Sequence, residues 1–488
     1  MKRIYRAQAN QRLEMPEMPN WDALVPRIQG GVVLPGSSGY SASRRPFNAR
    51  FRDVRPSAIV SCASPQDVSE AILFARRHGL ELAARSGGHS FAGHSATSGM
   101  VIDVSPMRSV SVAGDVATVG AGARLGHVYE ALQEHGLTIP GGTCPTVGVA
   151  GLTLGGGLGI LGRKYGVTSD HLIGAEVVLA DGRILQCDDH HEQDLFWALR
   201  GAGAGNFGVV TTLVFRAVPA PEVTTNVYLA WPPTSAAAVI QAWQRWAPTG
   251  PDELAASLKI TGGDDPDRPP AVDVYGAFHG SRADAAQLLE ELVSRVGSDP
   301  IATGLTPMTW PQTRKFWAEL GDADESAGGP SIAEPTEQLC LYAKSEFFGR
   351  PLPGEAIGAL LAAFVEERTS GESRELDFMP WGGAYNRRRP EDTAFIHRDE
   401  LFQLKHAVAL DPDAPSVTKA AAHQAAIRSW ASVHPWGSGR VFQNFADPDL
   451  EHWAAAYYGP NYHRLVRVKA QYDPSNFFQF QQSLPPRQ

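Results

Sequence analysis

The stretch 58–90 alternates short apolar runs with one amphipathic segment. An apolar run opens it, and Ser64 followed by Pro65 then suits the N-cap and first residue of a helix. Behind this pair, Val68 and Ile72 recur at helical spacing. A second apolar run follows and ends in glycines. The pattern predicts a strand, a helix, a second strand and a loop.

The same alternation of strands and helices continues to residue 220. Residues 100–120 predict three short strands, and residues 125–135 carry a helical apolar stripe. Asp181 and Gly182 lie between two apolar runs and mark the turn of a hairpin. A helix, a glycine loop and a strand are predicted from residue 194 onward. We expect an α+β domain here, not a long parallel β/α series.

Glycine becomes rarer after residue 220, and tryptophan and longer helical patterns appear. The predicted helices are 235–248 and 283–297. The strand-like runs that alternate with them are 271–280, 338–348, 374–386 and 401–410. They predict a second α+β domain with an antiparallel sheet over 221–440. A helix and an extended tail follow in 441–488, and residues 1–50 predict an irregular arm.

Composition and charge narrow the class of protein. The 488 residues are too many for one ordinary hydrophobic core, so we expect at least two domains. A net charge of −9 without a block of lysine or arginine disfavours nucleic acid as a partner. We find neither an apolar run of membrane-spanning length nor a secretory signal. Four cysteines without framework spacing suggest reduced thiols, so we expect a cytoplasmic protein without a membrane partner.

Glycine is concentrated in four segments, SGGHS, GGTCPTVGVAG, LGGGLG and GAGAGNFG. Ten of the twenty-six residues in 141–166 are glycine, which argues against ordinary helix or strand there. Backbone N–H groups without neighbouring side chains form concave anion sites, and pyrophosphate is a usual guest. The segments favour a large phosphate-bearing cofactor over tight turns alone, although none matches a dinucleotide-binding fingerprint.

Two nucleophilic side chains, His89 and Cys144, lie inside these glycine segments. A lone histidine is usually a hydrogen-bonded structural residue, and a lone cysteine is usually a small core residue. The functional interpretation therefore rests on the position of each residue inside a glycine loop, where the backbone can approach a ligand closely. Metal ligation is the competing use. The nearest ligand sets, His89 with His94 and the pair at 190–191, are incomplete, and no metal site is predicted.

Four motifs together resemble the berberine-bridge-enzyme-like flavoproteins of the vanillyl-alcohol-oxidase class. They are ARSGGHSFAGHS, GGTCPTVGVAGLTLGGGLGILGRKYG, GAGAGNFGVVT and the tail RLVRVKAQYDPSNFFQFQQSLPP. The resemblance covers the chain from about residue 50 to its end. It implies a two-domain, PCMH-type α+β fold. An FAD-binding domain would occupy 1–220, with its core at about 55–220, and a substrate domain 221–440. Residues 441–488 would return to the FAD domain.

The resemblance also implies how FAD is held. The histidine that matches His89 bonds to the flavin 8α carbon in such proteins, and the cysteine that matches Cys144 bonds to C6, so the chain resembles the bicovalent subgroup. Val147 matches a gate for oxygen, where valine is similar to the oxidases. The other cofactor-binding residues that we expect are Arg85, Ser86, Gly87, Gly88, Ser90, Gly148, Gly151, Leu152, Gly156, Gly208, Val210 and Asn476.

The chain departs from the family where relatives carry polar catalytic groups. Leu152 and Leu158 replace a histidine and a tyrosine of some relatives. FQNFADPD resembles the YxNYxD motif of sugar-oxidising members, but Phe442 and Phe445 lack the phenol. Arg387 falls where the plant alkaloid enzyme has a catalytic glutamate, and an arginine is a poor base. The usual bases are therefore absent.

Other side chains become the candidate bases. Tyr385 is our first choice, with Tyr342, Glu346 and Tyr458 beside it as catalytic candidates. Strand alternation places Tyr342 and Glu346 on one face of a strand, which we expect to face the flavin. We further considered Lys344, Gln403, His406 and Tyr457.

The resulting hypothesis is an FAD-dependent oxidase that moves hydride from a small organic substrate to flavin N5, after which O₂ reoxidises the flavin and yields H₂O₂. The apolar replacements suggest an aromatic or polyketide-like alcohol of secondary metabolism, or an oxidative dehydrogenation or cyclisation. An oligosaccharide oxidase and a flavin-carrying binding protein without efficient catalysis are the alternatives. The expected partners are the substrate and O₂, and the chain is expected to be a monomer or homodimer.

Overall fold

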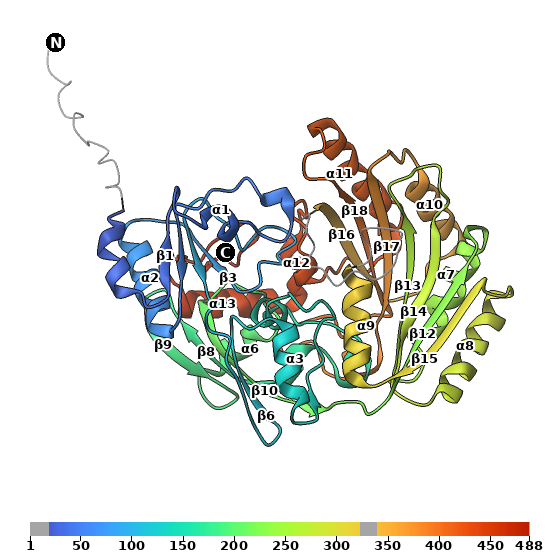
Figure 1. The fold of residues 1–488 in the computed structure, drawn as a ribbon, viewed down its shortest axis with the longest axis horizontal. Coiled ribbons are helices and arrows are strands. Elements are labelled where there is room, and N and C mark those ends of the chain that lie inside the picture. Colours follow the sequence, from blue (N-terminus) through green and yellow to red (C-terminus); the bar gives the residue numbers. More distant parts are fainter. Residues whose placement is uncertain (1–18, 323–338, 488) are drawn as a thin grey trace, which may run out of the picture.

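The computed structural model describes residues 19–322 and 339–487, and two halves with separate sheets lie side by side in it (Figure 1). The first 18 residues of the predicted arm and the first residue of the predicted strand 338–348 lie outside the described residues. Both halves combine helices with sheets, so the predicted α+β class is confirmed.

The first half contains a four-stranded sheet and a five-stranded antiparallel sheet. The four-stranded sheet has the order β1-β2-β4-β3, in which β4 is parallel to both β2 and β3. The five-stranded sheet has the order β5-β6-β10-β8-β9, and a short β11-β7 pair accompanies it. The strands are β1 (Gly31–Val33), β2 (Ala58–Ser61), β3 (Leu82–Arg85), β4 (Met100–Asp103), β5 (Val110–Ala113), β6 (Val116–Gly120), β7 (Leu137–Thr138), β8 (Leu172–Val178), β9 (Ile184–Cys187), β10 (Val209–Arg216) and β11 (Val218–Pro219).

The helices of this half are α1 (Tyr40–Ser43), α2 (Pro65–Arg77), α3 (Leu125–Gln133), α4 (Val149–Leu154), α5 (Gly162–Tyr165) and α6 (Gln193–Leu199). Of these, α2, α3 and α6 begin close to the predicted positions. The Ser64 hydroxyl accepts the Asp67 N–H at 3.2 Å, which confirms the predicted N-cap of α2. The expectation that 141–166 contains no ordinary helix is wrong. Within α4 only Gly151 is a glycine and within α5 only Gly162, and the other glycines of this segment lie before, between or after the two helices.

The second half is built on one seven-stranded antiparallel sheet. Its order is β15-β12-β14-β13-β17-β18-β16. The strands are β12 (Thr224–Trp231), β13 (Leu254–Gly262), β14 (Ala271–Phe278), β15 (Ala302–Met308), β16 (Cys340–Phe348), β17 (Glu372–Pro380) and β18 (Phe402–Leu410). The helices are α7 (Ala236–Trp246), α8 (Arg282–Val296), α9 (Trp310–Asp322), α10 (Gly354–Val365) and α11 (Ser416–Ala431).

The two faces of this sheet have different roles because strand residues alternate between them. One face packs against α7, α8 and α10, with Leu376 and Phe378 of β17 in the shared core, and α11 covers the strands at its β16 edge. The alternate residues Glu375 and Asp377 point to the opposite face, toward the first half. The sheet therefore presents charged side chains to the space between the halves.

Buried arginines join the two halves. The Arg398 guanidinium, from the loop that follows β17, donates to both carboxylate oxygens of Asp170 at 2.7 and 2.9 Å. Both side chains are almost completely buried. Arg163 of α5 donates to the carbonyls of Pro248 at 2.9 Å and Gly250 at 2.7 Å. These contacts fix the position of the charged sheet face over the first half.

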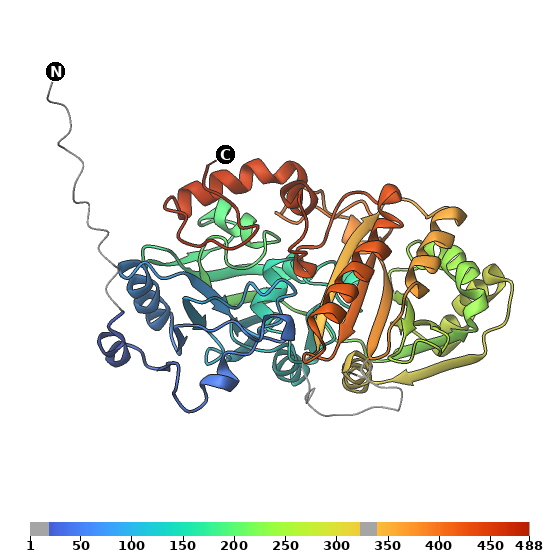
Figure 2. The same ribbon diagram turned by 90° about the horizontal axis from the view of Figure 1, so that it is seen from above.

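The C-terminal segment crosses back to the first half (Figure 1 and Figure 2). Its helices α12 (Trp453–Tyr458) and α13 (Tyr462–Tyr472) contribute side chains to the core of that half. Lys469 is completely buried and donates to the carbonyls of Asn206 and Phe478 and to the carboxylate of Asp473. Asp473 in turn accepts the backbone N–H of Phe477 and Phe478. The YDPSNF motif thus closes the tail onto the glycine loop at 201–208. Among the described residues, no helix has the length and apolar character that crossing a membrane requires.

Replacing Lys469 with methionine removes the cation and leaves the Asp473 carboxylate buried without its partner. Breaking a buried ion pair in this way costs about 3–5 kcal/mol, so we expect a free energy of unfolding lower by about that amount. Urea unfolding followed by tryptophan fluorescence measures it. Arg467→Met, on the exposed side of the same helix, is the matched control. A loss no larger than in this control would contradict the role given to Lys469.

Candidate active site

A cavity of about 630 Å³ lies between the two halves. This is within the usual size range of ligand and cofactor sites. The first half contributes residues 82–91, 142–154 and 202–210, and the second half contributes parts of β13, β17 and β18. Residues 442–446 of the C-terminal segment form a further wall.

Two glycine loops touch through their backbones at the floor of the cavity. A Cβ added to Gly87 would lie 2.2 Å from the Gly148 nitrogen, and one added to Gly148 would lie 2.2 Å from the Gly87 nitrogen. No real side chain tolerates such a contact, so both positions require glycine. The loop after β3, which carries His89, is thereby packed against the loop that carries Cys144.

His89 and Cys144 converge on the hydroxyl of Thr146. The Thr146 Oγ1 atom lies 3.0 Å from His89 Nε2 and 3.2 Å from Cys144 Sγ. Both residues line the cavity. The sequence indicated both side chains but not that Thr146 bridges them, because nothing in the spacing distinguishes this threonine from its neighbours.

The surroundings of His89 favour the neutral imidazole. Burial, with a smaller contribution from Arg124, lowers the pKa of His89 to about 4. The ring stacks on Phe47 with centroids 4.2 Å apart. Because Thr146 occupies Nε2, and Nδ1 has no hydrogen-bond partner among the described residues, Nδ1 is the nitrogen left for a ligand. A neutral ring with one available nitrogen is a nucleophile or an acceptor.

The residues present fit the FAD that the sequence implies. A Cβ on Gly151 would point into open space, so backbone and not side chain faces the cavity there. The expected cofactor-binding residues that line the cavity are His89, Cys144, Arg85, Ser86, Gly87, Gly88, Ser90, Val147, Gly148, Gly151, Leu152, Gly208 and Val210. A floor of glycine backbone beside a histidine and a cysteine suits a flat, phosphate-bearing group.

Two expected cofactor residues lie outside the cavity wall. Gly156 has a φ of +107° and packs against Phe395, whose ring leaves no room for a Cβ. Asn476 has a φ of +52° and donates its backbone N–H to the Asp473 carbonyl at 3.0 Å. Both residues shape turns instead of lining the site. Arg85 lines the site, but its guanidinium donates to the carbonyls of Ser43 and Ser95 and braces the loop.

The wall opposite the glycine floor is aromatic on one side and charged on the other. Phe445 packs on Phe91 with ring centroids 5.0 Å apart. Lys405 Nζ lies 5.5 Å from the centroid of the Phe445 ring. The family departures Leu152, Leu158, Phe442 and Phe445 all line the cavity. Arg387 is instead exposed and pairs with Asp252.

The charged side is one that our sequence reasoning missed. Glu375, Asp377 and Lys405 line the cavity from adjacent strands. Lys405 Nζ lies 2.9 Å from Glu375 Oε1 and 3.4 Å from Asp377 Oδ2. Lys259 Nζ lies 3.1 Å from Glu375 Oε2. The signal was present: these are charged residues at alternate positions in strands that are otherwise apolar.

Tyr385, our first choice of base, lies outside the cavity wall. It is 3% exposed and stacks on Trp381 with centroids 4.1 Å apart. Its hydroxyl donates to the Gly159 carbonyl at 3.2 Å. Burial raises the pKa of the Tyr385 phenol. The prediction that Tyr385 faces the flavin is therefore wrong, because the aromatic cluster between the halves encloses it.

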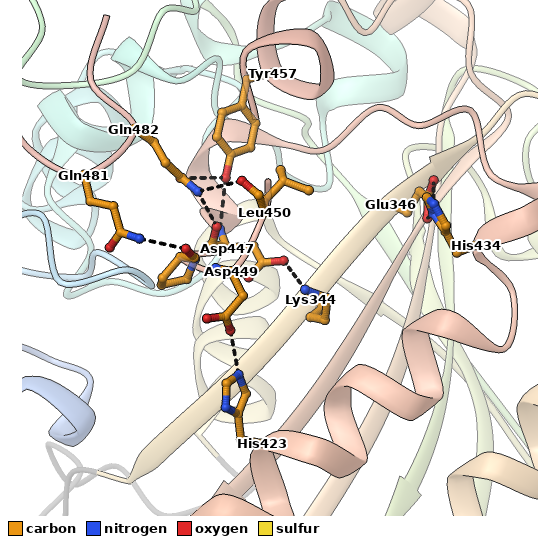
Figure 3. Close-up of polar contacts among 11 residues, drawn as sticks. Lys344, Glu346, His423, His434, Asp447, Asp449, Leu450, Tyr457, Gln481 and Gln482 are labelled. Atoms are coloured by element: carbon orange, nitrogen blue, oxygen red, sulfur yellow. Dashed lines mark hydrogen bonds and ion pairs between the residues drawn. The ribbon is translucent and has the colours of Figure 1, made fainter. Parts of the chain in front are cut away.

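Tyr342 and Glu346 share a face of β16, as alternation predicted, but α11 and the loop after it cover this face. Tyr342 stacks on His423 with centroids 5.0 Å apart. Glu346 lies 2.8 Å from His434 Nδ1 (Figure 3), and burial raises the pKa of Glu346 although His434 opposes the shift. Leu341, one position along, is the residue that lines the cavity. The expectation that Tyr342 and Glu346 point toward the flavin is therefore wrong, because the alternate residues of β16 face the cavity.

Three further candidates also have structural partners or no access. Lys344 forms a buried ion pair with Asp447 (Figure 3). His406 Nδ1 lies 2.8 Å from the Ser429 hydroxyl on the side of α11. Gln403 is fully buried, and neither side-chain polar atom has a hydrogen-bond partner among the described residues.

Tyr457 and Tyr458 do line the cavity. The Tyr458 hydroxyl donates to the Ala202 carbonyl at 2.8 Å, and the Tyr457 hydroxyl donates to the Gln482 side chain at 3.3 Å (Figure 3 shows the Tyr457 contacts). Burial raises the pKa of both phenols. Of the four predicted catalytic residues, only Tyr458 is at the cavity.

Comparisons with known proteins agree with this geometry. Residues 56–188 match the family described as FAD binding domain, and residues 441–485 match the family described as Berberine and berberine like. The chain is 32% identical over 468 residues to an uncharacterized FAD-linked oxidoreductase, YvdP, of Bacillus subtilis, covering 94% of this chain and 99% of that protein. It is 32% identical over 474 residues to the chitooligosaccharide oxidase of Gibberella zeae, covering 93% and 92% of the two chains.

The similarity extends to solved structures. A glucooligosaccharide oxidase of Acremonium strictum superposes with a TM-score of 0.85 at 27% identity, over 97% of this chain and 99% of that one. The described fold is thus the PCMH-type FAD-binding fold with an antiparallel sheet, as the resemblance implied, and the cofactor is FAD. The chain belongs to the berberine-bridge-enzyme-like family of FAD-linked oxidoreductases.

Proposed function

We propose that this oxidoreductase is an oxidase that carries FAD on two covalent bonds and oxidises a small hydroxylated organic molecule with O₂, releasing H₂O₂. The convergence of His89 and Cys144 on Thr146, at a floor of glycine backbone, carries the proposal. In this assignment residues 1–220 and 441–488 bind FAD, and residues 221–440 bind the substrate.

The first half supplies the residues that would hold the flavin for the reaction. FAD, once bound, would accept a hydride (one proton with two electrons) from the substrate and pass the two electrons to O₂, which with two protons gives H₂O₂. His89, neutral because burial lowers its pKa, provides a nitrogen for the 8α carbon, and Cys144 provides sulfur for C6. Thr146 holds the two side chains toward one another. Two bonds fix the position of the flavin, so the rest of the cavity wall is free to accommodate substrate.

The walls favour an apolar substrate with few hydroxyl groups. Phe442 and Phe445 stand where the resembling sugar-oxidising members carry tyrosines, and both rings line the cavity. Leu158 adds apolar surface to the same region. An aromatic or polyketide-like alcohol of secondary metabolism fits such a lining. Dehydrogenation or oxidative ring closure of such a molecule would use the same transfer of electrons.

An oligosaccharide oxidase is the second candidate. Its support is the similarity to a chitooligosaccharide oxidase and to a glucooligosaccharide oxidase. The charged residues Glu375, Asp377 and Lys405 on the sheet suit hydroxyl groups of either class of substrate. A peroxide assay under oxygen with two panels separates the candidates. We expect turnover with polycyclic aromatic alcohols, whereas turnover with cellobiose, xylobiose or chitobiose alone would replace the first candidate by the second. Absence of peroxide from both panels would count against the oxidase proposal itself.

The two bonds can be separated by variants. After denaturation in SDS, we expect yellow in-gel fluorescence to stay with the polypeptide in the wild type and in Cys144→Ala and His89→Ala, because one bond remains in each variant. The double variant should release all of its flavin. A Cys144→Ala protein that loses its flavin on denaturation would refute the bond through His89.

Val147 generates a separate prediction about oxygen. It lines the cavity three residues after Cys144. Val147→Ile should slow reoxidation of the dithionite-reduced protein by O₂ about tenfold or more, which corresponds to about 1.4 kcal/mol of activation free energy. Stopped-flow absorbance measures this rate directly. Val147→Ala is the control and should not slow it, and an unchanged rate in Val147→Ile would remove the proposed oxygen gate.

A further inference from the structure

The Thr146 hydroxyl lies between the two side chains to which we assign the flavin. Its Oγ1 atom is 3.0 Å from His89 Nε2 and 3.2 Å from Cys144 Sγ, and all three residues line the cavity. A hydroxyl carries a single hydrogen, so it donates to only one of these partners. Toward the other partner it can only accept. The direction of the two hydrogen bonds therefore fixes where the hydrogens of His89 and Cys144 lie.

The backbone holds Thr146 in this position independently of its side chain. Val147, directly after it, accepts the Leu125 N–H on its carbonyl at 2.9 Å. Pro145, directly before it, accepts the Gly126 N–H on its carbonyl at 3.0 Å. The loop is thus attached to the beginning of α3 on both sides of Thr146. We therefore expect a change of this side chain to leave the path of the loop intact.

One direction of the bonds agrees with the surroundings of His89. A neutral imidazole has one N–H and one bare nitrogen. Burial, with a smaller contribution from Arg124, keeps the ring neutral by lowering its pKa to about 4. If Thr146 donated to Nε2, the ring N–H would lie on Nδ1, which has no acceptor within the described chain. Buried N–H groups are seldom left without an acceptor, and unpaired acceptors are less rare. The ring hydrogen therefore lies on Nε2 and points to Thr146.

The same direction makes the sulfur an acceptor. Once Thr146 accepts from His89 Nε2, its own hydrogen is free to point at Cys144 Sγ. The thiol hydrogen is then not held between sulfur and oxygen, and His89 Nδ1 presents a lone pair. Both nucleophilic atoms are thus uncovered on the sides away from Thr146.

We propose that Thr146 is the positioning residue for flavin attachment, which accepts the Nε2–H of His89 and donates to Cys144 Sγ, so that Nδ1 and the sulfur are ready to bond. This inference rests on the proposed attachment of FAD through two bonds. Each bond replaces one hydrogen on a flavin carbon and one on a side chain, either the Nε2 hydrogen of His89 or the thiol hydrogen of Cys144. The two electrons and two protons removed for each bond pass to O₂ and give H₂O₂.

Two variants separate the hydroxyl of Thr146 from its shape. Thr146→Val keeps the branched shape and removes the hydroxyl, whereas Thr146→Ser keeps the hydroxyl. Each is combined with Cys144→Ala, in which only the His89 bond can form, and with His89→Ala, in which only the Cys144 bond can form. The full chain, produced under riboflavin limitation, is mixed with FAD in air. The flavin fluorescence that stays with the polypeptide in SDS is then followed over time.

We expect Thr146→Val to slow attachment at least about tenfold in both backgrounds and Thr146→Ser to slow it less than about threefold, because only the first variant loses the group that orients the nucleophiles. Thr153→Val is the matched control. Thr153 lies on α4 outside the cavity lining, and its hydroxyl is buried without a hydrogen-bond partner among the described residues. This control should attach flavin at the rate of its parent.

The position of the ring hydrogen gives an independent measurement. Nitrogen NMR of the flavin-free full chain, labelled with nitrogen-15 in histidine, distinguishes a protonated ring nitrogen from a bare one. The spectrum of His89→Ala identifies the His89 signals by difference. At neutral pH, well above the pKa of about 4, we expect a hydrogen on Nε2 and a bare Nδ1. A hydrogen on Nδ1 contradicts the proposal.

The outcomes separate this inference from the proposed function. A wild type that retains no flavin after denaturation overturns the attachment through two bonds first. A wild type that retains its flavin, with Thr146→Val bonding at the parent rate in both backgrounds, overturns the role of Thr146 alone. Should Thr146→Val fail to bind FAD, as absorbance before denaturation shows, the NMR measurement on the unaltered chain decides.

Discussion

The contact between Gly87 and Gly148 is the constraint on which the site depends. The backbone nitrogen of each glycine occupies the space that the other's side chain would need, so the two loops approach to backbone contact. This contact brings His89 from one loop and Cys144 from the other to a single hydroxyl, that of Thr146. A side chain at either glycine would separate the loops and with them the two nucleophiles. The concentration of glycine around one imidazole therefore has a physical cause.

The second half completes the site through the alternation of strand residues. Leu376 and Phe378 hold the sheet to its helices, and Glu375 and Asp377 between them face the cavity. The buried Arg398–Asp170 pair keeps this charged face over the glycine floor. Flavin binding and substrate chemistry are thus assigned to opposite walls, one built from backbone and the other from side chains.

Much of the fold could be predicted from the sequence because its signals are local. The cap at Ser64, the hairpin turn at Gly182 and the long second-half strands follow from spacing over a few residues. The glycine segments and their two nucleophiles also indicated the cavity wall to which we assign the flavin. The helix at α4 was missed because overall glycine content hid a six-residue stretch that contains only Gly151.

The cavity wall that we assign to the substrate was harder to predict because its geometry is non-local. Which face of β16 meets the cavity depends on where α11 packs, and Tyr342 and Glu346 were assigned to the wrong face for this reason. Tyr385 follows a conspicuous glycine pair, yet the closing of the two halves encloses it. The charged side formed by Glu375, Asp377 and Lys405 emerged only from the register of neighbouring strands.

Peptide mapping of the unaltered protein tests the central claim most directly. Trypsin should cut after Arg85 and Arg108, and after Arg124 and Arg163, which leaves His89 and Cys144 on separate peptides. The account predicts one yellow species in the digest, with a mass equal to peptides 86–108 and 125–163 joined through a single flavin. A flavin attached to one of these peptides alone, or released from both, would contradict the claim that the two glycine loops hold one flavin between them.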